Sequence, residues 1–195
     1  DLTADNVVLA TPAYVTADLV RATAPELSAV LDTIGYVDVA NATLAFRAAD
    51  VPPLPPGTGF LVPPIEREFI VGCSWLTNKW PHLANEDVVL IKSMVGRAGD
   101  TRWLSMSDAE IVDGVRDGLA RILDVDAAPI ATYVQRWPRA MPQYTVGHAE
   151  RLARIESLTP TGLHLTGAAY RGAGLAACTT QAAATAASIL EGTQP

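Results

Sequence analysis

The chain of 195 residues has few cysteines, few basic residues and no long apolar run. Its two cysteines, Cys73 and Cys178, are too few and too far apart for a disulfide framework, and neither has a Cys or His neighbour at metal-ligand spacing. Lys and Arg number 14 against 21 Asp and Glu, which gives a formal net charge of −7. The scattered basic residues form no electrostatic footprint for nucleic acid. We therefore expect neither a metal site nor a nucleic-acid partner.

The sequence also lacks membrane and secretion signals. No apolar run reaches the roughly 18 residues needed to span a bilayer, and no basic leader precedes an apolar segment. We expect a cytoplasmic protein whose membrane contact is at most peripheral. Apolar residues form 49% of the chain, which is enough for a sizeable core. The chain enters an apolar strand soon after Asp1, so we expect the pairing partners of this strand in preceding sequence of a longer protein.

The spacing of apolar and breaker residues predicts an α+β fold. Strands are expected at residues 6–10, 36–48, 60–62, 69–75, 88–95, 129–137 and 163–167. Helices are expected at residues 14–23, 25–33, 147–158 and 175–190, with one more after Ser107, which stands at capping-box spacing from Glu110. Strands that follow one another directly in the middle of the chain indicate an antiparallel sheet.

Two features of this sheet are predicted in more detail. In the strand 36–48, Val37, Val39, Leu44 and Phe46 alternate with small or polar residues, so one face of the strand is expected to be packed. Residues 49–59 hold four prolines and must form a loop. We interpret this loop as a hairpin connection, because strand-like runs continue on both of its sides.

Residues 137–178 form the most informative stretch of the sequence. Within it, a short apolar strand leads into a turn with glycines at 167, 172 and 174, and an alanine-rich helix follows. Such a turn allows a ligand to approach closely, and the helix N-terminus offers free N–H donors, which suits a phosphate or the polar edge of a flavin ring. The same glycines are equally compatible with plain close packing of the helix on the strand. The order of the glycines is not that of a Rossmann fingerprint.

Aromatic and histidine residues allow two interpretations. Trp137, followed by Met141-Pro-Gln-Tyr144 and Gly147-His148, could line a pocket for a flat conjugated ligand or pack within the protein. His82, His148 and His164 are the only histidines, and none has the spacing of a catalytic triad or a metal site. The sequence identifies no catalytic side chain, and His148 is only a weak candidate for a base.

Several motifs in register together resemble one enzyme family. They are Asn6-Val-Val-Leu-Ala-Thr-Pro-Ala13, Gly59-Phe-Leu-Val-Pro63 with Glu66, Trp75 with Lys79-Trp-Pro81, Val95-Gly-Arg97, Arg136-Trp137 with Met141-Pro-Gln-Tyr144 and Gly147-His148, and Gly167-Ala-Ala-Tyr-Arg-Gly172 with Gly174 and Cys178. In this order they resemble the C-terminal part of the FAD-dependent coproporphyrinogen III and protoporphyrinogen oxidases of haem biosynthesis, which belong to the amine-oxidase-like flavoproteins.

The resemblance implies how the chain is organised. Residues 1–24 would end a segment of the FAD-binding domain, residues 25–133 would form a partial substrate-binding domain, and residues 134–195 would return to the FAD-binding domain. The expected fold is thus an α/β remnant of an FAD domain joined to a substrate domain with a mixed, antiparallel sheet. The implied cofactor is FAD, and the implied partner is the N-terminal half of the FAD domain, which carries the dinucleotide fingerprint in this family.

The resemblance also implies site residues. The expected FAD contacts are Trp137, Gly174, Leu175, Ala176 and Ala177, and the expected substrate contact is Leu61. The chain departs from the family pattern at residues 176–177 and at residues 181–183, where a Gly and a basic residue are common. These departures affect the finer FAD contacts but not contacts made by backbone N–H groups.

The implied reaction is the oxidation of a porphyrinogen to the porphyrin by FAD and dioxygen, with release of hydrogen peroxide. In such chemistry the cofactor carries the electrons, and the protein supplies orientation and exclusion of water. The sequence does not distinguish coproporphyrinogen III from protoporphyrinogen IX as the substrate. The alanine-, valine- and proline-rich composition is typical of a high-GC bacterial source, for which the family would imply, by analogy, the coproporphyrinogen route. Two alternatives remain: another amine-oxidase-like flavin oxidase, and a non-catalytic tetrapyrrole-binding fragment. The isolated chain is expected to be inactive and to hold no FAD.

Overall fold

The computed structural model describes residues 2–83 and 86–192, which divide into two compact units. The terminal unit combines residues 1–36 with residues 141–195, and the sheet unit consists of residues 37–140. These divisions fall later than the expected ones after residues 24 and 133, because α2 (Pro25–Leu31) packs against α1 (Ala13–Val20) and α5 (His148–Leu158). The functional roles expected for the three segments stay a prediction.

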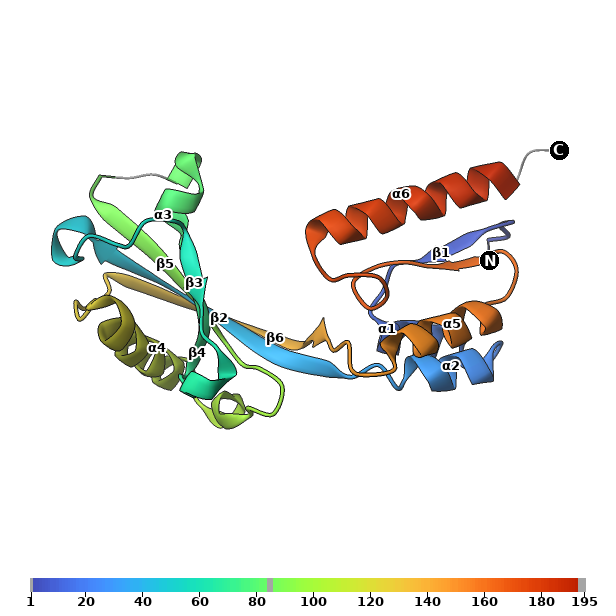
Figure 1. The fold of residues 1–195 in the computed structure, drawn as a ribbon, viewed down its shortest axis with the longest axis horizontal. Helices are drawn as coiled ribbons and strands as arrows, with labels where there is room; N and C mark the ends of the chain where they lie inside the picture. Colours follow the sequence, from blue (N-terminus) through green and yellow to red (C-terminus); the bar gives the residue numbers. More distant parts are fainter. Residues whose placement is uncertain (1, 84–85, 193–195) are drawn as a thin grey trace. The chain divides into compact units, whose positions relative to one another are not determined.

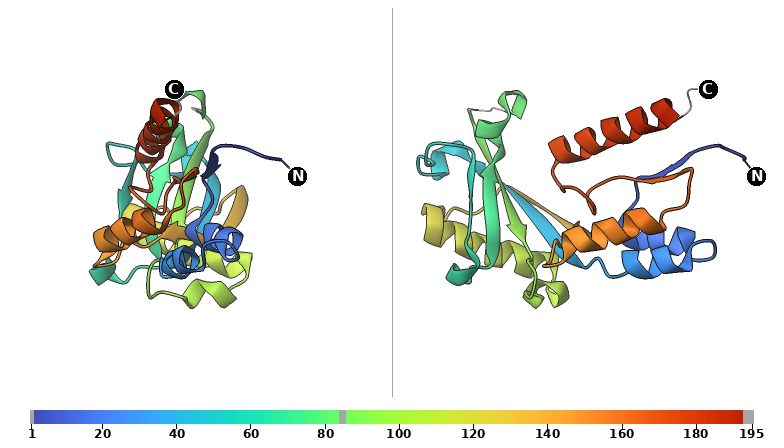
Figure 2. Two further views of the ribbon diagram at one scale, coloured as in Figure 1. Left: turned by 90° about the vertical axis from the view of Figure 1, so that its right-hand side faces the viewer. Right: turned by 45° about the vertical axis from the view of Figure 1, so that its right-hand side comes forward.

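The terminal unit is built around a pair of parallel strands. β1 (Val7–Leu9) pairs with β7 (Leu163–Leu165), with Val8 opposite His164. Helices α1, α2 and α5 lie on one side of this pair, and α6 (Leu175–Gly192) runs along the other (Figures 1 and 2). The apolar core lies on the three-helix side and includes Ala17, Leu27, Leu31 and Ile155. α6 contributes no buried residue.

The sheet unit contains five strands in the order β3-β4-β5-β2-β6. Their bounds are β2 (Tyr36–Arg47), β3 (Gly59–Leu61), β4 (Ile70–Trp75), β5 (Val88–Val95) and β6 (Ala131–Pro142). The pairs β3–β4, β4–β5 and β5–β2 are antiparallel, which confirms the predicted sheet. The α+β fold class is confirmed as well.

Helix α4 (Asp108–Leu123) covers one face of this sheet (Figure 1). Its N-terminus has the predicted capping box: the Glu110 N–H donates to Ser107 Oγ (3.3 Å), and the Ser107 N–H donates to the Glu110 carboxylate (2.7 Å). The carboxylate also accepts from the Ser107 hydroxyl, and these bonds lower the pKa of Glu110. α4 buries its apolar stripe, which consists of Ile111, Val115, Leu119 and Leu123.

Two predictions about β2 and its loop need correction. The buried face of β2 carries Ala40, Ala42, Leu44 and Phe46, whereas Val37 and Val39 lie on the opposite, partly exposed face. The bulk of the two valines favours a core position. Side chains of a strand alternate between its faces, however, and the buried face carries the even-numbered residues, so Val37 and Val39 lie on the other face. The proline-rich segment is a loop, as predicted, but not a hairpin connection, since β4 and β5 separate β3 from β2 in the sheet.

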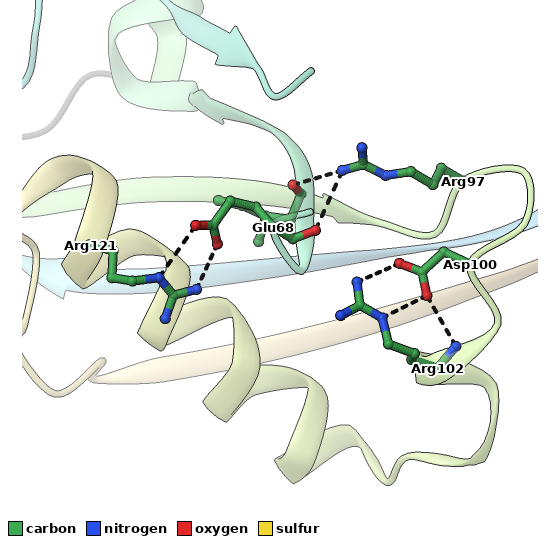
Figure 3. Close-up of polar contacts among 6 residues, drawn as sticks. Glu68, Arg97, Asp100, Arg102 and Arg121 are labelled. Carbon is green, nitrogen blue, oxygen red and sulfur yellow. Dashed lines mark hydrogen bonds and ion pairs between the residues drawn. The ribbon is translucent and has the colours of Figure 1, made fainter. Parts of the chain in front are cut away.

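Short elements and ion pairs complete the sheet unit. The helix α3 spans Leu76–Lys79, and single 3₁₀ turns occur at Ala48–Asp50, Pro64–Glu66, Pro81–Leu83 and Arg102–Ser105. Figure 3 shows Glu68 paired with Arg121 of α4 (2.6 Å), while Arg97 donates to the backbone oxygens of Glu68 and Ile70. The Arg121 guanidinium lowers the pKa of the Glu68 carboxyl, and these contacts join the start of β4 to α4. Asp100 and Arg102 form a second pair in the same view (2.6 Å).

Candidate functional site

The glycine-rich turn between β7 and α6 has a conformation that requires glycine. Gly167 and Gly172 have φ values of 122° and 121°, which side-chain-bearing residues rarely adopt. A Cβ built on Gly172 would lie 2.6 Å from the Ala177 Cβ, whereas one on Gly174 would meet nothing within 4 Å. Gly172 thus brings the loop backbone against the first turn of α6, and of the two positions only Gly172 needs glycine for this packing.

The N-terminus of α6 presents free backbone donors. Cys178 is the first residue of α6 whose N–H donates to a backbone oxygen, that of Gly174 (2.9 Å). Within the described residues, the N–H groups of Leu175, Ala176 and Ala177 have no hydrogen-bond acceptor. The Leu175 side chain is 88% exposed, and the two alanines carry no bulk. Three of the expected FAD-contact residues therefore share one exposed helix start whose dipole end is positive.

The side chains of Tyr144 and Gln181 hold the loop in place, a role that the sequence alone predicts for neither. The Tyr144 hydroxyl donates to Ala168 O (2.6 Å) and accepts from the Gly172 N–H (2.8 Å). Gln181 on α6 accepts from the Arg171 N–H (3.2 Å) and donates to Gly172 O (3.2 Å). Gln181 stands where we expected the family's Gly and basic residue, and its amide ties the loop to the helix.

His148 supports the same loop from the first residue of α5. Its ring stacks on Tyr144 with centroids 4.2 Å apart and an interplanar angle of 13°, and its Nε2 lies 2.9 Å from Tyr170 O. The backbone oxygen can only accept, so His148 Nε2 donates. Tyr170 is 5% exposed, and burial raises the pKa of its phenol. His148 therefore has a structural role in the turn, and nothing in its contacts marks it as a base.

A groove of about 1020 Å³ lies between α6 and the α5 and β7 side of the terminal unit. α6 lines it mainly with small side chains, such as Ala184 and Ser188. The opposite wall mixes apolar side chains with polar ones; they include Ile155, Leu163, Leu165, Glu156 and His164. The two strands beneath it are partly open, with Val7 and Val8 each 46% exposed. A two-stranded parallel sheet with exposed valines is an incomplete layer by the standards of α/β proteins.

The remaining predicted contacts lie in the sheet unit. Trp137 is on β6 and is 49% exposed. Its neighbour Arg136 turns toward the helix side, where it pairs with Asp108 of α4 (2.7 Å), so strand alternation directs Trp137 to the opposite face. Leu61 on β3 is 76% exposed, and it covers the space above Gly72, where a Cβ would lie 2.8 Å from Leu61 Cδ2. The roles of both residues stay a prediction.

The described ranges contain neither a cluster of metal-binding side chains nor a helix that could span a membrane. Residues 2–83 and 86–192 contain no group of three or more His, Cys, Asp or Glu side chains that could hold a metal ion. Both cysteines are free, and burial raises the pKa of Cys73 to about 11. No helix in the same ranges is long and apolar enough to cross a bilayer.

Comparisons with known proteins agree with this architecture. The family model described as flavin containing amine oxidoreductase matches residues 1–190. Coproporphyrinogen III oxidase of Bacillus subtilis is 34% identical over 194 residues, which cover 97% of this chain and 40% of the relative. Protoporphyrinogen oxidase of Bos taurus is 30% identical over 202 residues and is covered to 42%. The chain thus spans about two fifths of the length of these relatives.

A solved structure extends the likeness to the fold. A candidate protoporphyrinogen oxidase from an Exiguobacterium species superposes with a TM-score of 0.77 at 31% identity, and the match covers 96% of this chain and 42% of that one. The resemblance predicted from the motifs is therefore confirmed for the family and for the fold.

Proposed function

The chain belongs to the flavin containing amine oxidoreductase family, and from this premise we propose that it forms part of an oxygen-dependent porphyrinogen oxidase. In this proposal it supplies the C-terminal half of an FAD site and most of a substrate-binding unit. The substrate is coproporphyrinogen III or protoporphyrinogen IX, and the products are the porphyrin and hydrogen peroxide. The names of the relatives support this substrate class.

The observation that carries the proposal is the exposed start of α6. Three free N–H groups, of Leu175, Ala176 and Ala177, lie at a helix N-terminus behind a turn whose φ values strongly favour glycine. Such donors suit the electron-rich polar edge of a flavin ring, because the helix dipole stabilises negative charge there. The residues present therefore fit FAD, and the fit depends on backbone groups that the changes at residues 176–177 leave intact.

Bound FAD would accept the hydride removed from the porphyrinogen and pass the electrons to dioxygen. The chain's own residues would orient the reactants. The N–H groups of residues 175–177 would fix the flavin ring, Trp137 would pack against the cofactor, and Leu61 would hold the macrocycle. We assign no side chain to proton transfer.

The proposed partner is a preceding segment that completes the FAD domain. Three observations support it. The parallel sheet has only two strands in the described residues, the valines of β1 are exposed, and α6, which borders the groove, has no buried residue. Further strands beside β1 and β7 would cover these surfaces. The share of the relatives that this chain covers, about two fifths, leaves length for such a segment.

Flavin retention tests the cofactor assignment. We expect the 195-residue chain alone to show no stoichiometric flavin absorbance and the complete enzyme to bind FAD. In the complete enzyme, Trp137→Ala should weaken FAD affinity about three- to tenfold, the range expected for loss of one aromatic contact. Trp80→Ala is the matched control, because Trp80 is 47% exposed on another element of the same unit. Unchanged FAD affinity in the Trp137 variant would refute the role of Trp137.

Substrate oxidation separates the proposal from its alternatives. Porphyrin fluorescence is followed with coproporphyrinogen III and with protoporphyrinogen IX, and peroxide formation is followed with aliphatic amines. The proposal predicts porphyrin from at least one porphyrinogen and no peroxide from amines. Peroxide from amines alone would identify another oxidase of the family. If the complete protein binds porphyrin and FAD but oxidises neither the porphyrinogens nor the amines, it is a non-catalytic binding protein.

A further inference from the structure

The sheet unit has one face that α4 does not cover, and we call it the open face. Strand register places its side chains in rows across the strands. One row runs from Leu61 through Gly72 to Met94, and the next runs from Ser74 through Lys92 to Thr43. The alternate residues Cys73, Trp75 and Ile91 point into the core beneath α4. The open face is thus defined by Leu61, Gly72, Met94, Ser74, Lys92 and Thr43.

The first row of the open face is apolar from Leu61 to Met94, and Asn41 stands opposite Met94 at its end. Gly72 has no side chain, and Leu61 Cδ2 and Met94 Cε close over it, 2.8 Å and 2.9 Å from the position that a Cβ would take. Leu61 is nevertheless 76% exposed, and Met94 is partly exposed. A flexible methionine and an exposed leucine beside a glycine form an adaptable apolar surface of the kind that flat ligands pack on.

Lys92 stands in the next row, about 7 Å further along the sheet. It is partly buried between Ser74 and Thr43, and no residue of the described ranges forms a hydrogen bond or ion pair with it. Arg97 of the same unit donates to backbone oxygens, and Arg102 and Arg121 pair with Asp100 and Glu68 (Figure 3). The stem of Lys92 is partly buried, whereas its Nζ is not among the buried unpartnered atoms of the described residues, so the ammonium is available to pair with an anionic group of a ligand on the open face.

The combination of an adaptable apolar row and an unpaired cation selects one class of occupant. A porphyrinogen is a flexible, puckered macrocycle of four largely apolar pyrrole rings whose rim carries propionate arms, and each arm ends in a carboxylate; an adaptable apolar surface suits such a ring. We infer that Lys92 Nζ binds a propionate carboxylate of the tetrapyrrole while the ring lies over Leu61, Gly72 and Met94. This assignment rests on the proposed function, which gives the substrate class, and it adds the residue that recognises the substrate's charge.

Coproporphyrin III, the product of the proposed reaction, is the probe for this site. It is titrated into the 195-residue chain, with binding followed by porphyrin absorbance and fluorescence. Lys92→Met should weaken binding at least about tenfold, the loss expected for a charge-assisted hydrogen bond, and Lys92→Arg should restore most of it. Raising the salt concentration should weaken binding to the wild type but not to the Met variant.

Two controls keep the interpretation specific. Lys79 is the only other lysine of the chain and is exposed on α3, so Lys79→Met removes the same charge without touching the open face. Coproporphyrin III tetramethyl ester lacks the carboxylates, so it should bind the wild type and Lys92→Met equally. Far-ultraviolet circular dichroism and thermal unfolding confirm that each variant is folded.

The outcomes separate this inference from the proposed function. Equal affinity of wild type and Lys92→Met for coproporphyrin III overturns the inference, and so does a wild-type chain that shows no saturable binding. Neither result touches the oxidase proposal, which the turnover of porphyrinogens by the complete enzyme decides. In that enzyme, Lys92→Met should raise KM for coproporphyrinogen III about tenfold with kcat little changed, because it removes binding rather than chemistry.

Discussion

Replacing Gly172 by alanine should disturb the loop conformation that places the start of α6, on which the flavin assignment depends. The φ of 121° at this position lies in a region that alanine rarely adopts, and holding alanine there costs about 1–3 kcal/mol. The new Cβ would also lie 2.6 Å from the Ala177 Cβ, whereas carbon atoms rest at about 3.5–4.0 Å. Since Ala177 has no flexible side chain, the backbone of the loop or of α6 must move.

The expected size of the effect follows from these two terms. If the loop stays in place, the free energy of unfolding falls by about 1–3 kcal/mol, which is a decrease in Tm of roughly 2–10 °C for a chain of this size. If the loop moves instead, the three free N–H groups at the start of α6 are displaced from the cofactor. FAD affinity of the complete enzyme should then fall by about 5- to 150-fold, the equivalent of the same energy.

Gly174→Ala provides the matched control. It adds the same methyl group two residues away, where no atom lies within 4 Å and φ is ordinary, so Tm should change little. The measurements are thermal unfolding of the 195-residue chain for both variants and FAD titration of the complete enzyme for Gly172→Ala. Equal Tm values for the two variants, together with an unchanged FAD affinity in Gly172→Ala, would refute the argument that Gly172 positions the start of α6.

Four further predictions concern Tyr144, Ser107 and the two cysteines. Tyr144→Phe removes a hydroxyl with two hydrogen bonds and should speed hydrogen exchange of the Gly172 amide about tenfold, measured by mass spectrometry or NMR; unchanged exchange would contradict the role of Tyr144. Ser107→Ala removes the N-cap of α4 and should lower the free energy of unfolding by about 1 kcal/mol in a denaturant titration, and no loss would contradict the capping argument. Burial raises the pKa of Cys73 from 9.0 to about 11, so iodoacetamide at pH 8 should modify Cys178 first. Between pH 9 and about 11 the unfolded chain loses the Cys73 proton that the folded chain keeps, so stability should fall as pH rises, and Cys73→Ala should lessen this fall.

Most elements of the fold could be predicted because each carries a local signal. Ser107 and Glu110 define the start of α4 through contacts only three residues apart, and β-rich apolar runs mark β2 and β5 as strands. Strand order is different, since it depends on contacts between distant segments. The four prolines after β2 show that a loop is present, but nothing in their spacing reveals that the chain crosses to the far edge of the sheet.

The same limit applies to the site. Glycines and a helix start at Leu175 are visible in the sequence, because their chemistry is local. The loop supports are not: Tyr144 contacts Gly172 across 28 positions, and Gln181 was read only as a departure from a family pattern. The sequence does not single out Lys92 either, because a lysine in a β-rich run is ordinary until strand register places it between Ser74 and Thr43, beside the apolar row of the open face.

The central claim is that this chain belongs to an enzyme that oxidises a porphyrinogen with FAD and dioxygen. The most direct test follows the complete enzyme with coproporphyrinogen III and with protoporphyrinogen IX, recording porphyrin fluorescence and hydrogen peroxide together. Three rounds of hydride removal convert a porphyrinogen to the porphyrin, so the account predicts three peroxide molecules for each porphyrin, at a rate that depends on bound FAD. Porphyrin formation no faster than in enzyme-free solution, with both substrates and with FAD bound, would contradict it.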